Sequence, residues 1–276
     1  MEGWLELRRG TGPLVVSFPH TGTDIPGDIE TQLISPWLGR KDTDWWVFEL
    51  YDAAQACGAS TLQTTVSRTV IDVNRDPEQV PLYAGVFSTG LCPLTTFDGE
   101  PLYRTGAEPD REQIQRRRAM FFDPYHAALS AELRRLRDLH PRVVLYDAHS
   151  IRSRVPRLFE GLLPNFNIGT YEGRSCDRQL AMLVEQACEH PSFTQVSNGR
   201  FKGGWTTRHY GQPQQGVHAI QMELACRSYM DEPSEPLSAM NWPQPFVPRR
   251  AAAVREILAR VLQACLQFSD AQERPP

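Results

Sequence analysis

The sequence predicts an α/β protein. Two short apolar runs, Pro13–Phe18 and Arg142–Tyr146, show no alternation of polar and apolar residues, which is typical of central strands covered on both faces. Two longer segments, Pro109–His140 and Arg250–Phe268, instead repeat their apolar residues at helical spacing. Buried strands and amphipathic helices in one chain indicate a sheet flanked by helices.

The other elements follow from the same patterns. Trp45–Cys57 has helical spacing and ends at Gly58, so we expect a helix with Asp42 and Asp44 available as caps before it. The pair Asp123-Pro124 predicts either a fresh helix start or a kink inside the long helical segment. Further strands are expected at Ala59–Val66, Thr69–Val73, Phe166–Ile168 and Val217–Leu224, and a further helix at Cys176–His190.

Composition narrows the class of protein. The chain has 276 residues, 41% of them hydrophobic and 22% charged, which suits one large domain or two small ones. A net charge of −4 gives no reason to expect nucleic acid or an anionic membrane as a partner. The sequence has no apolar signal core, no run of about 20 apolar residues and six scattered cysteines without a Cys-x-x-Cys pair. We therefore expect a cytoplasmic protein with reduced, buried thiols, and the sequence carries no prediction of oligomeric state.

The stretch Ser67–Arg75 combines β-branched residues with polar ones. We expect it to be extended, with Asp72 and Asn74 on one face and Arg75 at the strand end. A guanidinium and an amide held there suit a carboxylate ligand, because arginine offers a planar, two-pronged donor. The alternative is a surface arginine that pairs with Asp72 and finishes the strand.

Two histidines lie at the carboxyl ends of the predicted central strands: His20 in a turn after the first, and His149 after the second. Open α/β sheets bind ligands at that edge, so a shared site is expected. Catalytic zinc takes three nitrogen or oxygen ligands, and Asp24, Asp44 or Asp147 could supply the third.

Glu223 lies inside an otherwise apolar strand, where a carboxylate needs a reason to be buried. It could take a proton from water, while Arg68 stabilises an oxyanion and Asn74 with Arg75 binds a substrate carboxylate. The alternative for Glu223 is a structural ion pair with Arg208 or Arg227. The segment Glu78–Arg104 is a long irregular loop of the kind that often covers a site.

From about Leu14 to Met230 the chain resembles the N-formylglutamate amidohydrolases. The resemblance is carried by Ser-Phe-Pro-His-Thr-Gly, Asp-Thr-Asp-Trp, Ser-Arg-Thr-Val-Ile-Asp-Val-Asn-Arg, Thr-Gly-Leu-Cys-Pro, Phe-Asp-Gly-Glu-Pro-Leu-Tyr, Tyr-Asp-Ala-His-Ser, Gly-Arg-Phe-Lys-Gly-Gly, Thr-Arg-His-Tyr-Gly and Gln-Met-Glu-Leu-Ala. It implies one catalytic domain over residues 1–276 with a three-layer α/β/α fold and a mixed central sheet, like that of the zinc carboxypeptidases. It also implies one divalent metal ion, with zinc expected, and a small N-acyl amino acid as substrate.

The resemblance also implies roles for single residues. His20 and His149 match the family's metal histidines, Glu223 its general base, and Arg68, Asn74 and Arg75 its substrate-binding arginine strand. Carboxypeptidase-like relatives use His-x-x-Glu for two ligands, but Thr23 stands three residues after His20 here. We therefore expect the carboxylate ligand to be Asp44, in the matching Asp-Thr-Asp-Trp motif, with Asp24 as the alternative. Arg208 is a candidate to bind the side-chain carboxylate of glutamate.

Three functions compete at this point. The leading hypothesis is hydrolysis of N-formyl-L-glutamate to L-glutamate and formate, a step in histidine degradation. The second keeps the site but changes the acyl group or the amino acid. The third is an amino-acid-binding relative without catalysis, for which a water-activating Glu223 would have no use.

Overall fold

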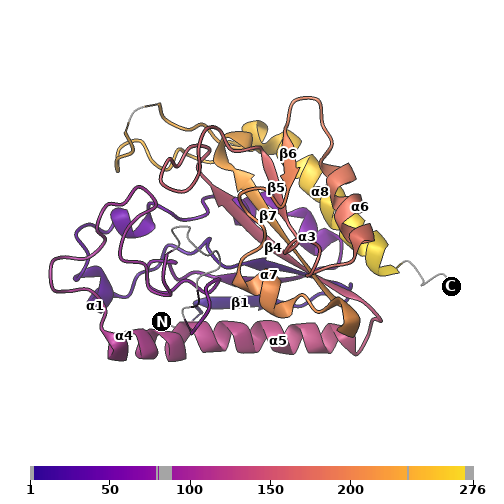
Figure 1. Cartoon of the computed structure of the whole chain (residues 1–276), viewed down its shortest axis with the longest axis horizontal. Coiled ribbons are helices and arrows are strands. Elements are labelled where there is room, and N and C mark those ends of the chain that lie inside the picture. Colours follow the sequence, from indigo (N-terminus) through magenta and orange to yellow (C-terminus); the bar gives the residue numbers. More distant parts are fainter. Residues whose placement is uncertain (1–2, 79, 81–88, 235, 271–276) are drawn as a thin grey trace.

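A mixed sheet of seven strands organises the part of the chain that the computed structural model describes, residues 3–78, 80, 89–234 and 236–270 (Figure 1). The strand order is β1-β3-β2-β4-β7-β5-β6. The strands are β1 (Leu5–Arg8), β2 (Leu14–Phe18), β3 (Ser60–Thr64), β4 (Val143–Ile151), β5 (Phe166–Gly169), β6 (Gln195–Ser197) and β7 (Val217–Ala225).

The four central strands β3, β2, β4 and β7 are parallel to one another, whereas β1 and β5 run antiparallel to their neighbours β3 and β7. β2 and β4 are buried along their whole length, as expected from runs without alternation. The chain leaves β2 toward β3 on one side and later returns to its other side as β4. The edge beyond the carboxyl ends of β2 and β4 is therefore a topological switch point, where open α/β sheets form crevices.

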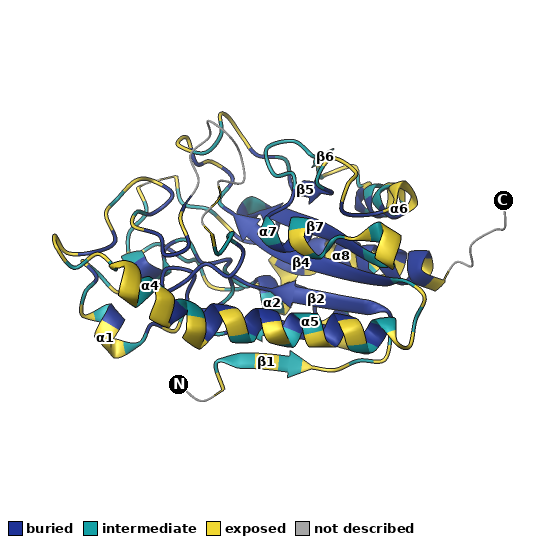
Figure 2. Cartoon of the chain, turned by 60° about the horizontal axis from the view of Figure 1, so that its bottom comes forward, coloured by how far each residue is buried: buried dark blue, intermediate teal, exposed yellow. Residues whose placement is uncertain are grey.

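Helices cover both faces of the sheet, and alternate residues of β2 point into two separate cores. Val16 packs with residues of α2 (Val47–Leu50), α6 (Arg178–Cys188) and α8 (Pro248–Asp270), whereas Val15 packs with α5 (Asp123–Arg137). Figure 2 shows buried and exposed residues alternating along α5, as expected for a helix with one face on the sheet. The predicted α/β/α fold with a mixed sheet is confirmed. The other helical segments are α1 (Gly27–Glu30), η1 (Leu38–Arg40), α3 (Ala53–Ala56), α4 (Arg111–Arg117), η2 (Arg118–Phe122), α7 (Trp205–Tyr210), η3 (Pro213–Gln215) and η4 (Cys226–Ser228).

The long helical segment predicted from Pro109 to His140 is one helical rod, α4–η2–α5, with a π-helical turn at Arg118–Phe122. Asp110 caps its start through a reciprocal capping box with Gln113. Pro124 has no N–H to donate in a regular helix, and the wider turn directly precedes it. The helix therefore continues through Asp123-Pro124, with a wider π-helical turn directly before this pair.

Two predictions of local structure are wrong. Ser67–Arg75 is not a strand but a series of turns, in which the Ser67 and Asp72 side chains accept hydrogen bonds from the amides of Thr69 (3.2 Å) and Asn74 (2.9 Å). Such local bonds compete with a strand ladder, and the β-branched residues are buried against the core beside α5 instead. Thr69–Val73 accordingly pairs with no strand as a hairpin within the described residues.

The helix predicted over Trp45–Cys57 is divided into α2 and α3. Trp46 adopts a left-handed conformation with φ of 64°, so α2 begins only after it, and Tyr51, with φ of −105° and ψ of 35°, ends α2 before α3 begins. Periodicity detects the apolar face but not such a backbone interruption.

The predicted loop Glu78–Arg104 lies partly outside the described residues, and its role as a lid stays a prediction. Its described part contains isolated bridges at Leu33–Tyr103 and Thr95–Pro101. Among the described helices, none combines the length and apolar character needed to cross a membrane.

Candidate metal centre and substrate pocket

Three buried side chains meet at the switch point between β2 and β4. His20 follows β2, His149 lies near the end of β4, and Asp44 is held beside them because its amide donates to the His20 carbonyl (2.9 Å). One ligand atom from each residue lies within 4.8 Å of the others. This is a possible metal site, assembled from segments up to 129 residues apart in sequence (149 minus 20).

Each imidazole also contacts a carboxylate of its own through its second ring nitrogen. The Nδ1 atoms of His20 and His149 face Asp44 Oδ2 at 3.7 and 3.0 Å. The Nε2 atoms lie 2.7 Å from Asp72 Oδ1 and 3.0 Å from Asp147 Oδ2, respectively. Metal-bound histidines usually have such an acceptor on the other ring nitrogen, because it fixes the ring and makes the ligand more basic.

The residues present fit a divalent cation. Within the described part of the chain, His20 Nδ1 and Asp44 Oδ1 are buried without a hydrogen-bond partner, which is unusual for polar atoms. Burial alone would raise the pKa of Asp44, but the hydrogen bond from His149 and the electrostatic effect of the nearby His20 outweigh it and hold that pKa below its ordinary value. Two imidazoles and one ionised carboxylate make a common donor set of catalytic zinc, which leaves a fourth position open.

Asp24, the alternative carboxylate, lies elsewhere. Its side chain accepts a hydrogen bond from the Thr65 hydroxyl (2.6 Å), and its backbone bridges to Val66. The structure brings Asp44, and not Asp24, to the two histidines.

Glu223 lies on β7, directly opposite His149 in the parallel register of β4 and β7. It lines the pocket while only 7% exposed, and its carboxylate accepts a hydrogen bond from Gln221 Nε2 (3.2 Å). Burial raises the pKa of Glu223 to about 8, with His149 acting against the increase and Asp44 adding to it. Among the described residues Glu223 has no ion pair with Arg208 or Arg227, so the structural ion pair considered for it does not form.

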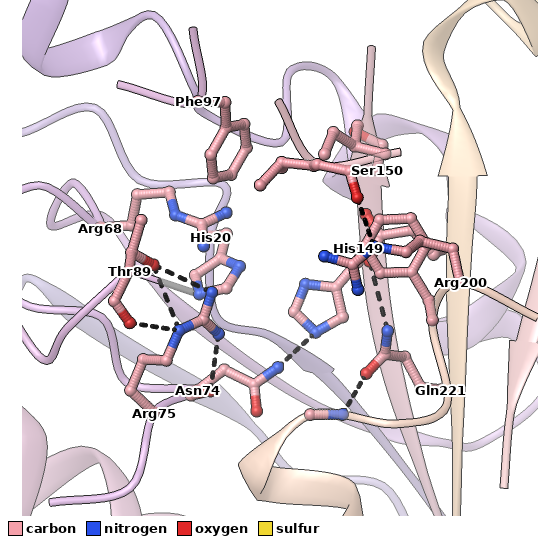
Figure 3. A pocket seen from close by; sticks show the side chains of 15 residues that line it. His20, Arg68, Asn74, Arg75, Thr89, Phe97, His149, Ser150, Arg200 and Gln221 are labelled. Carbon is pink, nitrogen blue, oxygen red and sulfur yellow. Dashed lines mark hydrogen bonds between the residues drawn. The ribbon is translucent and has the colours of Figure 1, made fainter. Parts of the chain in front are cut away.

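Two arginines of the Ser67–Arg75 segment line the same pocket (Figure 3). Arg68 is buried, lies 4.9 Å above the Phe97 ring and pairs with Asp72 (2.7 Å). Arg75 is held by the Thr89 hydroxyl (3.0 Å) and lies 3.6 Å from Asp72. One carboxylate thus holds both guanidinium groups and also His20 in position.

Asn74 lies between the histidines and α7. Its Nδ2 is 2.9 Å from His149 Nε2 and 3.2 Å from Asp147 Oδ2, and its Oδ1 accepts from the Thr206 amide (2.8 Å). A Cβ on Gly204 would lie only 2.5 Å from Asn74 Nδ2, so this contact requires glycine. Asn74 lines the pocket, and its amide also donates to Asp147, the carboxylate that faces His149.

The α4–η2–α5 rod braces the segment that carries these residues. Arg117 Nη1 donates to the Val70 carbonyl (3.2 Å), and His126 Nε2 donates to the Val73 carbonyl (2.8 Å). His126 is also packed against the rings of Phe122 and Trp205. A segment without regular secondary structure therefore has fixed anchor points next to Asn74 and Arg75.

Arg208 is not among the residues that line this pocket. Its Nε donates to the Gly203 carbonyl (2.9 Å), and its guanidinium lies 4.7 Å from the centre of the Tyr171 ring. Arg200, which sequence reasoning did not single out, lines the pocket instead. The available signal was its place in Gly-Arg-Phe-Lys-Gly-Gly, whose arginine precedes Lys202 by two residues.

Comparison with known proteins gives a consistent result. A family model described as N-formylglutamate amidohydrolase matches residues 12–230. The chain is 45% identical to N-formylglutamate deformylase of Pseudomonas aeruginosa, over 97% of the chain and 98% of that protein. It is 42% identical to the enzyme of the same name from Pseudomonas putida, over 97% of each. Its fold is similar to a crystal structure of N-formylglutamate amidohydrolase from Ralstonia eutropha JMP134, with a TM-score of 0.72, 25% identity, and coverage of 96% of this chain and 97% of that one.

Proposed function

Because this chain belongs to the N-formylglutamate amidohydrolase family, we propose that it hydrolyses N-formyl-L-glutamate to L-glutamate and formate in a metal-dependent reaction. The observation that carries the proposal is the buried cluster of His20, Asp44 and His149, whose two histidines line one pocket together with Glu223, Arg68 and Arg75. A pocket with a water-activating group and carboxylate-binding groups suits an amide that carries a neighbouring carboxylate.

His20, Asp44 and His149 would hold one divalent ion, which we expect to be zinc from the two-imidazole, one-carboxylate donor set. When bound, such an ion polarises the formyl carbonyl and lowers the pKa of a water molecule. Asp72 and Asp147 would keep both imidazoles in their orientation through the Nε2 contacts.

Glu223 acts as the general base. It removes a proton from the water that attacks the formyl carbon, and it returns this proton to the leaving amine nitrogen as the C–N bond breaks. Its position opposite His149, in the lining of the same pocket, supports this role, and a pKa of about 8 suits both transfers. The products are formate and the free amino group of glutamate.

Arg68 stabilises the negative charge that develops on the formyl oxygen, and Arg75 binds the α-carboxylate with support from Asn74. Arg68 is preorganised for this role by Asp72 and by the ring of Phe97, so little reorganisation is needed during the reaction.

Formate release measured together with bound metal tests this proposal. Purified protein should contain about one equivalent of zinc or a similar ion and should release formate from N-formyl-L-glutamate. N-acetyl- and N-succinyl-glutamate are the control substrates, and their faster turnover would favour a different deacylase. Metal binding without turnover of any of them would favour the non-catalytic alternative.

Glu223→Gln tests the mechanism. The variant keeps the size of the side chain but cannot accept the proton, so turnover should fall at least about 100-fold while metal content and thermal midpoint are retained. Glu132→Gln is a matched control, because Glu132 is also buried but pairs with Arg135 and does not line the pocket. That variant should lower the thermal midpoint and leave turnover per folded molecule unchanged. A fully active, metal-loaded Glu223→Gln variant would show that Glu223 is not the general base.

A further inference from the structure

A third arginine, Arg200, lines the pocket in addition to Arg68 and Arg75. In Figure 3, Arg68 and Arg75 enter the pocket from one side, and Arg200 enters from the other. The arginines at the first side belong to the segment after β3, whereas Arg200 belongs to the connection between β6 and α7. Cationic groups on opposite walls suit a substrate with two separated negative charges, such as a dicarboxylate.

The backbone that carries Arg200 is held in place before a ligand arrives. Two residues earlier, Asn198 adopts a left-handed conformation with φ of 51°, which asparagine tolerates better than most residues. Its Oδ1 accepts from the amides of Thr170 (3.0 Å) and Glu172 (3.2 Å). A side chain on such a fixed support loses less conformational entropy on binding.

The Arg200 side chain is itself anchored. Its Nε donates to the carbonyl of Leu158 (2.7 Å), another residue of the pocket lining. The apolar side chains of Leu158, Ile151 and Phe201 line the same pocket. They suit the methylene groups of a substrate side chain whose end reaches a guanidinium.

We propose that Arg200 binds the side-chain carboxylate of the substrate and thereby sets a preference for acidic N-formyl amino acids. The proposal rests on the function proposed above, in which Arg75 binds the α-carboxylate. It assigns to Arg200 the role that sequence reasoning gave to Arg208, which stacks on Tyr171 and is absent from the pocket lining. Arg208→Gln is therefore a matched control with the same change of charge.

The kinetic test compares N-formyl-L-glutamate with N-formyl-L-glutamine, which has the same shape but a neutral side chain. Arg200→Gln should lower kcat/KM for N-formyl-L-glutamate by about 100-fold, mainly through KM, and change it less than about threefold for N-formyl-L-glutamine. Arg208→Gln should leave the ratio of the two substrates unchanged. Activity of the Arg200 variant on the neutral substrate also shows that it is folded.

Equal losses on both substrates would overturn the proposal, because they would mark Arg200 as a general or structural residue. A substrate-selective loss in Arg208→Gln instead would restore the assignment to Arg208. A wild-type enzyme that prefers N-formyl-L-glutamine would also overturn it.

A binding experiment separates this proposal from the proposed reaction. Calorimetric titration with L-glutamate and L-glutamine needs no turnover. If wild-type protein prefers L-glutamate and Arg200→Gln abolishes that preference, Arg200 reads the carboxylate even if no formate is released. If formate is released but L-glutamate is not preferred over L-glutamine, the reaction stands and the role of Arg200 is refuted.

Discussion

His126 gives a prediction whose size can be calculated. The imidazole is 8% exposed, and its Nε2 donates to the Val73 carbonyl (2.8 Å) while its Nδ1 lies 3.0 Å from the Tyr210 hydroxyl. Burial lowers the pKa of His126 from 6.5 to about 4, although the hydrogen bond to Val73 opposes the decrease. The folded protein therefore keeps this histidine neutral where the unfolded chain protonates it.

The sign of the effect follows from proton uptake. Between pH 6.5 and about 4 the unfolded chain binds a proton at His126 that the folded chain does not, so acid favours unfolding. The contribution of His126 to the free energy of unfolding should thus be fully present above pH 6.5 and should decrease as the pH falls. From pH 7.5 to pH 5 the loss from this one group should be about 2 kcal/mol.

Urea unfolding of metal-free protein and of His126→Gln checks this value. Glutamine retains a donor for the Val73 carbonyl but cannot titrate, so the variant should lack this component of the acid destabilisation. The stability difference between wild type and variant should narrow by about 2 kcal/mol from pH 7.5 to pH 5, and stay constant between pH 7.5 and 8.5. Burial also lowers the pKa of His218 to about 4. His218 titrates in both proteins, so its contribution cancels in the difference between wild type and variant. A difference that did not change with pH would show that His126 titrates alike in both states.

Two further predictions concern the ligand set and the substrate. Asp44→Ala should lower bound metal at least about tenfold, while Asp24→Ala, which removes the hydrogen bond from Thr65, should keep its metal. If Asp24→Ala loses more metal than Asp44→Ala, Asp24 and not Asp44 is the ligand. Arg75→Lys should lower kcat/KM for N-formyl-L-glutamate by about 10- to 100-fold, because an ammonium cannot make the two-pronged contact. An N-formyl amine without a carboxylate should be turned over equally slowly by both proteins, and a variant with unchanged kcat/KM would leave Arg75 without this role.

The sheet could be predicted because its signals are local. Pro13–Phe18 and Arg142–Tyr146 are apolar without interruption, and the structure has β2 and β4 there. The two histidines could be singled out for the same reason, since each follows such a run and parallel strands end at one edge. Residues that directly follow parallel strands lie at the same edge of the sheet, whatever the rest of the fold is.

Other features depend on contacts that a pattern does not contain. Asp24 stands four residues after His20 and Asp44 stands 24 after it, yet the hydrogen bond from the Asp44 amide to the His20 carbonyl holds Asp44 at the histidines. Asp72 was placed in a strand, whereas a turn directs it to His20 and two arginines. The shape of Ser67–Arg75 is set by side-chain hydrogen bonds and by packing on a helix about 50 residues later, which propensity cannot register.

The π-helical turn at Arg118–Phe122 changes the phase of the rod between Arg117 and His126. At about 100° per residue, nine residues of regular helix would rotate His126 half a turn away from Arg117, onto the opposite side. One extra residue absorbed by the wide turn brings the two side chains to within about a quarter turn, so both reach carbonyls of the same segment. A regular helix of the same length would have more regular backbone bonding at this turn, but it would rotate one of the two side chains away from its carbonyl. The helix and the pocket thus have opposite requirements at this turn, and the chain follows those of the pocket.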